Sequence, residues 1–198
     1  YHFGQGIVDS PSDFGRMGSQ PTHPELLDWL AVWFRDDAKG SLKQLHRLIV
    51  TSKAYQQSSQ ERADAAKIDA DNRYLWRMNR TRLDAESLRD AMLAVTGKLD
   101  TRMGGPADRL FFFKDDHSPV YDYARFDVDS PGGYRRTIYR FIVRSVPDPF
   151  MERLDCPDPS MLTAKRSTTL TAIQALALLN NPFVVRMAEH LAARVSAR

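Results

Sequence analysis

The C-terminal block of the sequence, residues 163–183, constrains the fold more than any other stretch. A basic, hydroxyl-rich lead-in is followed by two apolar helical runs, which are separated by Asn180-Asn181-Pro182. Asn181 is a favourable N-cap residue, and Pro182 suits a first helical turn, where its missing N–H has no hydrogen bond to lose. The block therefore predicts a pair of helices joined by a tight corner, which we place within residues 161–198.

The N-terminal half of the chain contains further stretches with helical periodicity. Thr22 and Glu25 have the spacing of a capping box. The run that follows is apolar around so much of its circumference that we expect burial on two sides, partly by a segment preceding Tyr1. Ser41 can cap a second helix, whose apolar residues fall in one stripe.

A third helix is predicted over residues 84–96. Glu86 and Asp90 favour its N-terminal half, and Gly97 supplies a left-handed stop. Its inward face is expected to comprise Leu88, Ala91, Met92 and Val95. These patterns predict a mainly α fold, in which one compact domain over residues 1–198 holds about five helices and at most a small β element.

The middle of the chain, residues 98–160, is expected to be irregular. Only Leu110–Phe113 and Arg135–Arg144 have a β-like composition, and the second is rich in β-branched and aromatic residues. The alternative is therefore an α+β fold in which these two runs pair. A loop lead-in at residues 1–21, rich in Gly, Ser and Pro, and the helices within residues 22–97 precede this middle segment.

Composition excludes several classes of protein. A net charge of +3 is too small a surplus to indicate a nucleic-acid partner. No apolar run approaches the ~18 residues that a membrane span needs. Cys156 is the single cysteine, so no intrachain disulfide can form. Because the chain opens at Tyr1 without a Met and stops within a helical pattern, we expect it to be a piece of a longer polypeptide.

We predict no metal or cofactor site in this segment. The histidines lack the spacing of a metal-binding pair, and Cys156 lacks the second cysteine and following histidine that covalent haem attachment requires. Residues 127–133 resemble the start of a calcium loop, but Pro131 stands at the third ligand position and Ile138 where the bidentate Glu is required. A looser calcium site in the acidic middle is the alternative, with Asp115, Asp116, Asp122, Asp127 and Asp129 as its candidate ligands.

The strongest polar constellation is basic. It comprises Arg135, Arg136, Arg140, Arg144, Lys165 and Arg166, with Tyr139 among them. Because many aspartates lie nearby in the sequence, the favoured interpretation is internal pairing that holds irregular loops in place. The alternative is an exposed patch for an anion or a glycan, in which the aromatic rings stack on sugars.

No catalytic signature is present in the sequence. We find no Gly-x-Ser-x-Gly, no phosphate-binding glycine loop and no carboxylate pair in a setting that would raise a pKa. The sequence therefore favours a protein that is not an enzyme.

Five stretches resemble the planctomycete-specific domain one (PSD-one) family, a domain of unknown function. They span almost the whole chain: Phe3-Gly4-Gln5-Gly6-Ile7-Val8, Asp13-Phe14-Gly15, Pro21 to Ala31, Arg82 to Asp90, and Gln174 to Phe183. The resemblance implies an exported, extracytoplasmic protein of several domains, often with a c-type cytochrome-like segment upstream. Any haem would bind in that segment, and the resemblance brings no catalytic residues with it.

Three hypotheses of function follow. The leading one is a non-catalytic structural or interaction module of an exported, cytochrome-associated multidomain protein, with the other domains of the polypeptide as its partners. The second is a hydrolase acting on an extracellular polysaccharide through carboxylates of the middle segment, and it requires a pocket in which two carboxylates converge. The third is a module that binds anionic glycans through the arginine and tyrosine side chains.

Overall fold

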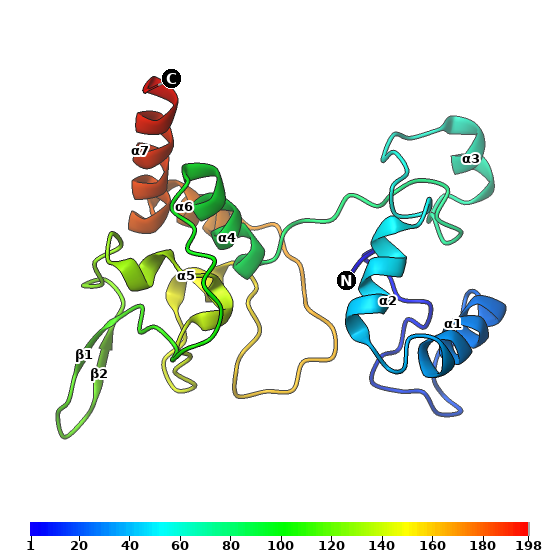
Figure 1. Ribbon diagram of the computed structural model, residues 1–198, viewed down its shortest axis with the longest axis horizontal. Helices are drawn as coiled ribbons and strands as arrows, with labels where there is room; N and C mark the ends of the chain where they lie inside the picture. The colour runs from blue at the N-terminus through cyan, green and yellow to red at the C-terminus, as the bar shows by residue number, and fades with distance from the viewer. Residues whose placement is uncertain (198) are drawn as a thin grey trace. The chain divides into compact units, whose positions relative to one another are not determined.

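The structure is a computed structural model that describes residues 1–197, and it is mainly helical, as predicted. The chain divides into two compact units, Tyr1–Thr81 and Arg82–Arg198, called unit 1 and unit 2 below (Figure 1).

Unit 1 contains three helices: α1 (Pro24–Asp36), α2 (Leu42–Thr51) and α3 (Ala63–Ile68). The predicted cap of α2 is confirmed, because the Ser41 side chain accepts a hydrogen bond from the Gln44 backbone N–H. The predicted capping box of α1 is wrong, since His23 occupies the N-cap position and its side chain makes no capping bond. The Thr22 backbone N–H donates instead to the Ile7 carbonyl at 2.9 Å, which holds Thr22 outside the helix.

The expectation that α1 is buried on two sides is also wrong. None of its residues is buried, and its large apolar side chains remain in contact with solvent. The buried polar residue of unit 1 is Asn72. Its backbone adopts the left-handed conformation, with φ 53°. Its side-chain amide donates to the Arg77 carbonyl at 2.8 Å and to Asn79 Oδ1 at 2.9 Å, and Asn79 in turn donates to the Phe3 carbonyl.

Unit 2 contains four helices: α4 (Ala85–Thr96), α5 (Pro149–Arg153), α6 (Ala172–Asn180) and α7 (Pro182–Ser196). Helix α7 packs against both α4 and α6, and α6 also contacts α5 (Figure 1). A cluster of buried apolar residues joins α4 to α5 and comprises Ala85, Phe150, Met151 and Leu154. Phe183 and Val184 of α7 pack against this cluster and complete the core.

Helix α4 begins and ends where the sequence predicts, but its buried face differs from the predicted one. Asp84 caps it by accepting from the Ser87 N–H at 2.7 Å, and Gly97 ends it at φ 73°. The buried residues are Ala85, Arg89, Leu93 and Thr96, whereas Val95 is 55% exposed. Two polar residues belong to the inward face because each has buried partners: Thr96 Oγ1 bonds backbone carbonyls of its own helix, and Arg89 bonds those of a neighbouring loop.

The two named strands of unit 2 form an antiparallel hairpin, and isolated parallel bridges join Asp100 to Arg135 and Asp108 to Arg140. Strands β1 (Phe112–Lys114) and β2 (Val120–Asp122) pair with Phe113 opposite Tyr121. The predicted pairing of Leu110–Phe113 with Arg135–Arg144 is therefore wrong. The second run instead contains the short 3₁₀ helix η2 (Thr137–Tyr139), preceded by η1 (Pro131–Tyr134), because the Asp90 carboxylate holds Thr137 through both its backbone N–H and its hydroxyl.

The C-terminal helix pair has the predicted corner. The Asn181 side chain accepts from the Phe183 N–H at 3.0 Å, with Pro182 in the first turn of α7. Thr171 and Gln174 form a reciprocal capping box at the start of α6. Within residues 1–197, no helix combines the length and the apolar character needed to cross a membrane.

Candidate functional site

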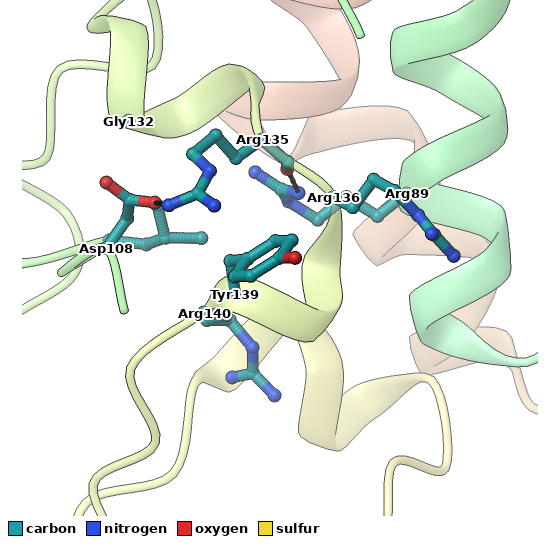
Figure 2. Close-up of a pocket in the computed structure, with 8 residues that line it drawn as sticks. Arg89, Asp108, Gly132, Arg135, Arg136, Tyr139 and Arg140 are labelled. Atoms are coloured by element: carbon teal, nitrogen blue, oxygen red, sulfur yellow. Dashed lines mark hydrogen bonds and ion pairs between the residues drawn. The ribbon is translucent and has the colours of Figure 1, made fainter. Parts of the chain in front are cut away.

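The candidate site is a group of side chains from α4, from η2 with the residues on either side of it, and from the loop at Asp108, and we call it the arginine cluster. Its members line a small hollow in unit 2 (Figure 2): Arg89, Asp108, Arg135, Arg136, Tyr139 and Arg140. Of the residues predicted from the sequence, Arg135, Arg136, Tyr139 and Arg140 are thus brought together.

Arg135 is the central member of the cluster. Its guanidinium donates to the carbonyls of Gly104 at 2.6 Å and Pro106 at 3.1 Å, and to Asp108 Oδ2 at 3.1 Å. Its guanidinium carbon lies 3.8 Å from the centre of the Tyr139 ring, a cation–π contact. Figure 2 shows the Asp108 carboxylate directed at the Arg135 guanidinium. The guanidinium therefore joins residues 104–108 to η2.

Arg140 has a side chain that is only 9% exposed, and its Nη1 lies 3.5 Å from Asp148 Oδ2. Asp148 has a second role, because its carboxylate caps α5 by accepting from the Phe150 N–H at 2.9 Å. Arg136 is different: its side chain is 45% exposed and stands 3.7 Å from Asp90. The cluster thus has buried members that link loops and one half-exposed member at its edge.

The sequence did not predict Arg89 as a member of the cluster. Its guanidinium reaches from α4 to three acceptors: the Gly133 carbonyl at 2.6 Å, the Arg135 carbonyl at 3.0 Å and Thr137 Oγ1 at 3.2 Å. Figure 2 shows the bond to Arg135. Burial lowers the pKa of Arg89 to about 10. The available signal was its spacing with Ala85 and Leu93 at successive turns of one helix.

Arg144, Lys165 and Arg166 do not line the hollow. Arg144 and Lys165 are exposed. Arg166 forms a bidentate salt bridge with Glu86, in which the two N–O distances are 2.6 and 2.8 Å. Burial alone would raise the pKa of Glu86, but the hydrogen bonds from Arg166 lower it below its ordinary value. The predicted constellation is therefore divided between two places in unit 2.

Cys156 lies next to the pair of Arg166 and Glu86. Its Sγ is 3.7 Å from Glu86 Oε1. Burial and the neighbouring carboxylate raise the pKa of the thiol. A raised thiol pKa disfavours the thiolate that nucleophilic chemistry needs.

A second polar group, also missed from the sequence, surrounds Asp129. Its carboxylate lies 2.8 Å from His190 Nε2, accepts from the Tyr134 hydroxyl at 2.8 Å and accepts from Arg186 Nε at 2.7 Å. These contacts lower the pKa of Asp129 to about 2. Burial of Tyr134 and the hydrogen bond to the Asp129 carboxylate both raise the pKa of Tyr134, to about 12. Asp129 was a candidate calcium ligand, and within residues 1–197 no three acidic, His or Cys side chains are grouped to hold a metal ion.

The chemistry that the arginine cluster can perform follows from its geometry. The hollow is too narrow to admit a water molecule. The guanidinium groups of Arg89 and Arg135 donate to backbone carbonyls, to a hydroxyl and to a carboxylate of the protein, whereas Nε of Arg135 and Nε of Arg140 lack a partner. The cluster can hold irregular loops together, and it offers no room for a substrate.

Comparison with known proteins gives one match. Residues 1–198 match the profile of the PSD1 family, described as a protein of unknown function (DUF1553). No curated protein and no solved structure matches the chain.

Proposed function

The chain belongs to the PSD1 family, and we propose that it acts as a non-catalytic structural or interaction module of an exported multidomain protein. In this proposal the protein is extracytoplasmic, and its partners are other domains of the same polypeptide. A c-type cytochrome-like segment among them would hold any haem.

The observation that carries the proposal is the inward use of the basic residues. Arg89, Arg135 and Arg140 are directed at backbone carbonyls and carboxylates of the same unit. Buried guanidinium groups in such settings stabilise a conformation, whereas a binding patch would present them to solvent. In this proposal these three arginines have a structural role.

The carboxylates support the proposal over the hydrolase hypothesis. A glycoside hydrolase needs one carboxylic acid with a raised pKa to protonate the leaving group. Burial would raise the pKa of Asp84, Glu86 and Asp155, but hydrogen bonds from neighbouring donors outweigh burial and lower it. These groups are therefore suited to pairing and poorly suited to proton donation.

The proposal is tested with polysaccharides and two matched variants. The chain is mixed with heparin, which is sulfated, and with polygalacturonate, which carries uronic acids, at low salt. We expect no saturable binding and no release of reducing ends. Arg136→Ala combined with Arg140→Ala should lower the melting temperature clearly, whereas the exposed Arg144→Ala should leave it unchanged.

Two results would contradict the proposal. Salt-sensitive, saturable binding that the double substitution abolishes at an unchanged melting temperature would establish a glycan-binding module. Release of reducing ends by the purified chain would establish a hydrolase.

A further inference from the structure

Helix α1 of unit 1 carries an apolar surface that no other part of its unit covers. Leu26, Trp29 and Val32 are 45%, 52% and 51% exposed, and Trp33 is half-buried beside them. The rings of Trp29 and Trp33 stack with centroids 6.3 Å apart and an angle of 18° between their planes. Helical spacing places these four residues, which we call the α1 face, on one side of the helix.

The rim of the α1 face is acidic. Residues 24–37 contain four carboxylates (Glu25, Asp28, Asp36 and Asp37) against one base (Arg35), a net charge of −3. Arg35 donates two hydrogen bonds, of 2.6 and 2.7 Å, to the Asp36 carboxylate. Glu25, Asp28 and Asp37 form no ion pair with any residue in the described range 1–197. Uncompensated negative charge therefore lies beside the exposed Trp29 and the half-buried Trp33.

We propose that the α1 face binds a basic amphipathic helix of another domain of the same polypeptide. Exposed tryptophans are the residue type that most often anchors protein interfaces. An apolar stripe on a helix is complementary to the apolar stripe of a second helix packed against it. Lysine and arginine at the edges of that second helix would meet the acidic rim, which fixes orientation and speeds association.

The acidic rim also argues against two other occupants. If a second copy of the chain packed its own α1 face against this one, like charges would be brought together, which is unfavourable. An anionic membrane surface would be repelled for the same reason. A basic helix satisfies both the apolar and the acidic parts of the surface. This inference rests on the proposed function, because it names a partner for an interaction module.

The test uses a labelled peptide of about fifteen Leu and Lys residues, long enough to form an amphipathic helix. The control peptide has Glu in place of every Lys. Binding to the full chain is followed by fluorescence anisotropy at low salt. We expect the Lys peptide to bind at least about tenfold more tightly than the Glu peptide, and high salt to reduce the difference because exposed charges are screened.

Substitutions locate the binding surface. Trp29→Ala should weaken binding of the Lys peptide about tenfold or more, as expected for an interface anchor. Glu25→Gln combined with Asp28→Asn should weaken binding of the Lys peptide less than Trp29→Ala does, and should reduce the salt dependence of that binding. Ile68→Ala is the matched control, since Ile68 is an exposed apolar residue of the same unit outside α1, and it should bind as the parent chain does.

Equal binding of the two peptides, no binding of the Lys peptide, or unchanged binding by Trp29→Ala would overturn the inference. A dimer in sedimentation that Trp29→Ala disperses would identify a second copy as the occupant and would also overturn it. These outcomes leave the proposed non-catalytic role intact, because that role fails only on the release of sugar ends or on glycan binding. The two failures are therefore distinguishable.

Discussion

The two units of the chain use different means to hold their structure. In unit 2, buried side chains come from all four helices and from the arginine cluster. In unit 1, the buried residues of the described chain are only Ala38 and Asn72. Unit 1 is instead held by hydrogen bonds such as those of the Asn72 amide, and it leaves Trp29 of α1 exposed.

This difference bears on how each unit responds to a partner. Burial of apolar surface is the dominant favourable term in folding, so the unit with little buried surface is expected to open locally at low cost. A ligand that binds the folded form stabilises it by mass action. We therefore expect a partner to change the stability of unit 1 more than that of unit 2.

The largest effect is expected from Arg89→Ala in unit 2. The substitution leaves three acceptors without a donor, at Gly133, Arg135 and Thr137. Loss of one partner from a buried charged network costs about 3–5 kcal/mol. Urea denaturation should show this loss, and hydrogen exchange should show it in the peptides of unit 2.

Arg89→Lys is the matched variant for that experiment. Lysine keeps the charge but cannot present the planar fork that reaches several acceptors at once, so most of the stability should remain lost. If Arg89→Ala changed the unfolding midpoint no more than the exposed Arg144→Ala, the cluster would not stabilise unit 2.

The next largest effect is expected from Leu93→Ala. Leu93 is fully buried in α4, and replacing such a leucine by alanine costs about 2–5 kcal/mol through lost transfer energy and the remaining cavity. Trp29→Ala is the counterpart in unit 1, and it should change stability by no more than about 0.5 kcal/mol because the side chain is half exposed. Similar losses in both variants would mean that α1 is covered in solution.

A smaller effect is expected from Asp129→Asn, and it should depend on pH. The folded-state pKa of Asp129 is about 2, below its ordinary value of 3.8, because His190, Tyr134 and Arg186 contact the carboxylate. A lowered pKa contributes stability that is complete above pH 3.8 and is lost as pH falls through about 2. The melting temperature of the parent chain should therefore fall more steeply than that of the variant over this range.

The control for Asp129→Asn is built into the same titration. The gap between the two melting curves should be widest at neutral pH and should close as the pH falls below about 2, because the parent carboxyl is then protonated. Parallel curves over the whole range would show that the contacts of Asp129 do not stabilise the fold.

Local signals in the sequence predicted much of the fold. The caps at Ser41 and Asn181 and the stop at Gly97 depend on residues within one turn, so spacing alone was enough to find them. The buried face of α4 was not predicted, because hydrophobicity ranks Val95 above Arg89. The partners that make Arg89 an inward residue lie more than forty positions away in the sequence.

The candidate site was predicted only in part, because some of its contacts join residues that are distant in the sequence. Arg135, Arg136 and Arg140 are close in sequence and line one hollow. Arg166 was grouped with them by charge, but it pairs with Glu86, eighty positions earlier. Neither spacing nor composition encodes such a distant contact.

A local effect is expected from replacing glycine at two equivalent turns. Gly40 follows α1 in unit 1 and Gly97 ends α4 in unit 2, at φ values of 74° and 73°. A side chain in this left-handed region costs about 1–2 kcal/mol. An added Cβ would meet nothing within 4 Å at Gly40, and at Gly97 it would meet the flexible end of Arg194 at 3.4 Å. The local strain of Gly40→Ala and Gly97→Ala should therefore be nearly equal.

The two substitutions should nevertheless differ in what they change. Gly97→Ala should lower the unfolding midpoint of unit 2, because α4 belongs to its buried core. Gly40→Ala should raise hydrogen exchange around the start of α2 and leave that midpoint unchanged, since unit 1 is expected to open by itself. Asparagine, which tolerates the left-handed region, should have a smaller effect than alanine at both positions. If Gly40→Ala shifted the midpoint as far as Gly97→Ala does, the two units would unfold together, and the weak burial seen in unit 1 would not determine its stability.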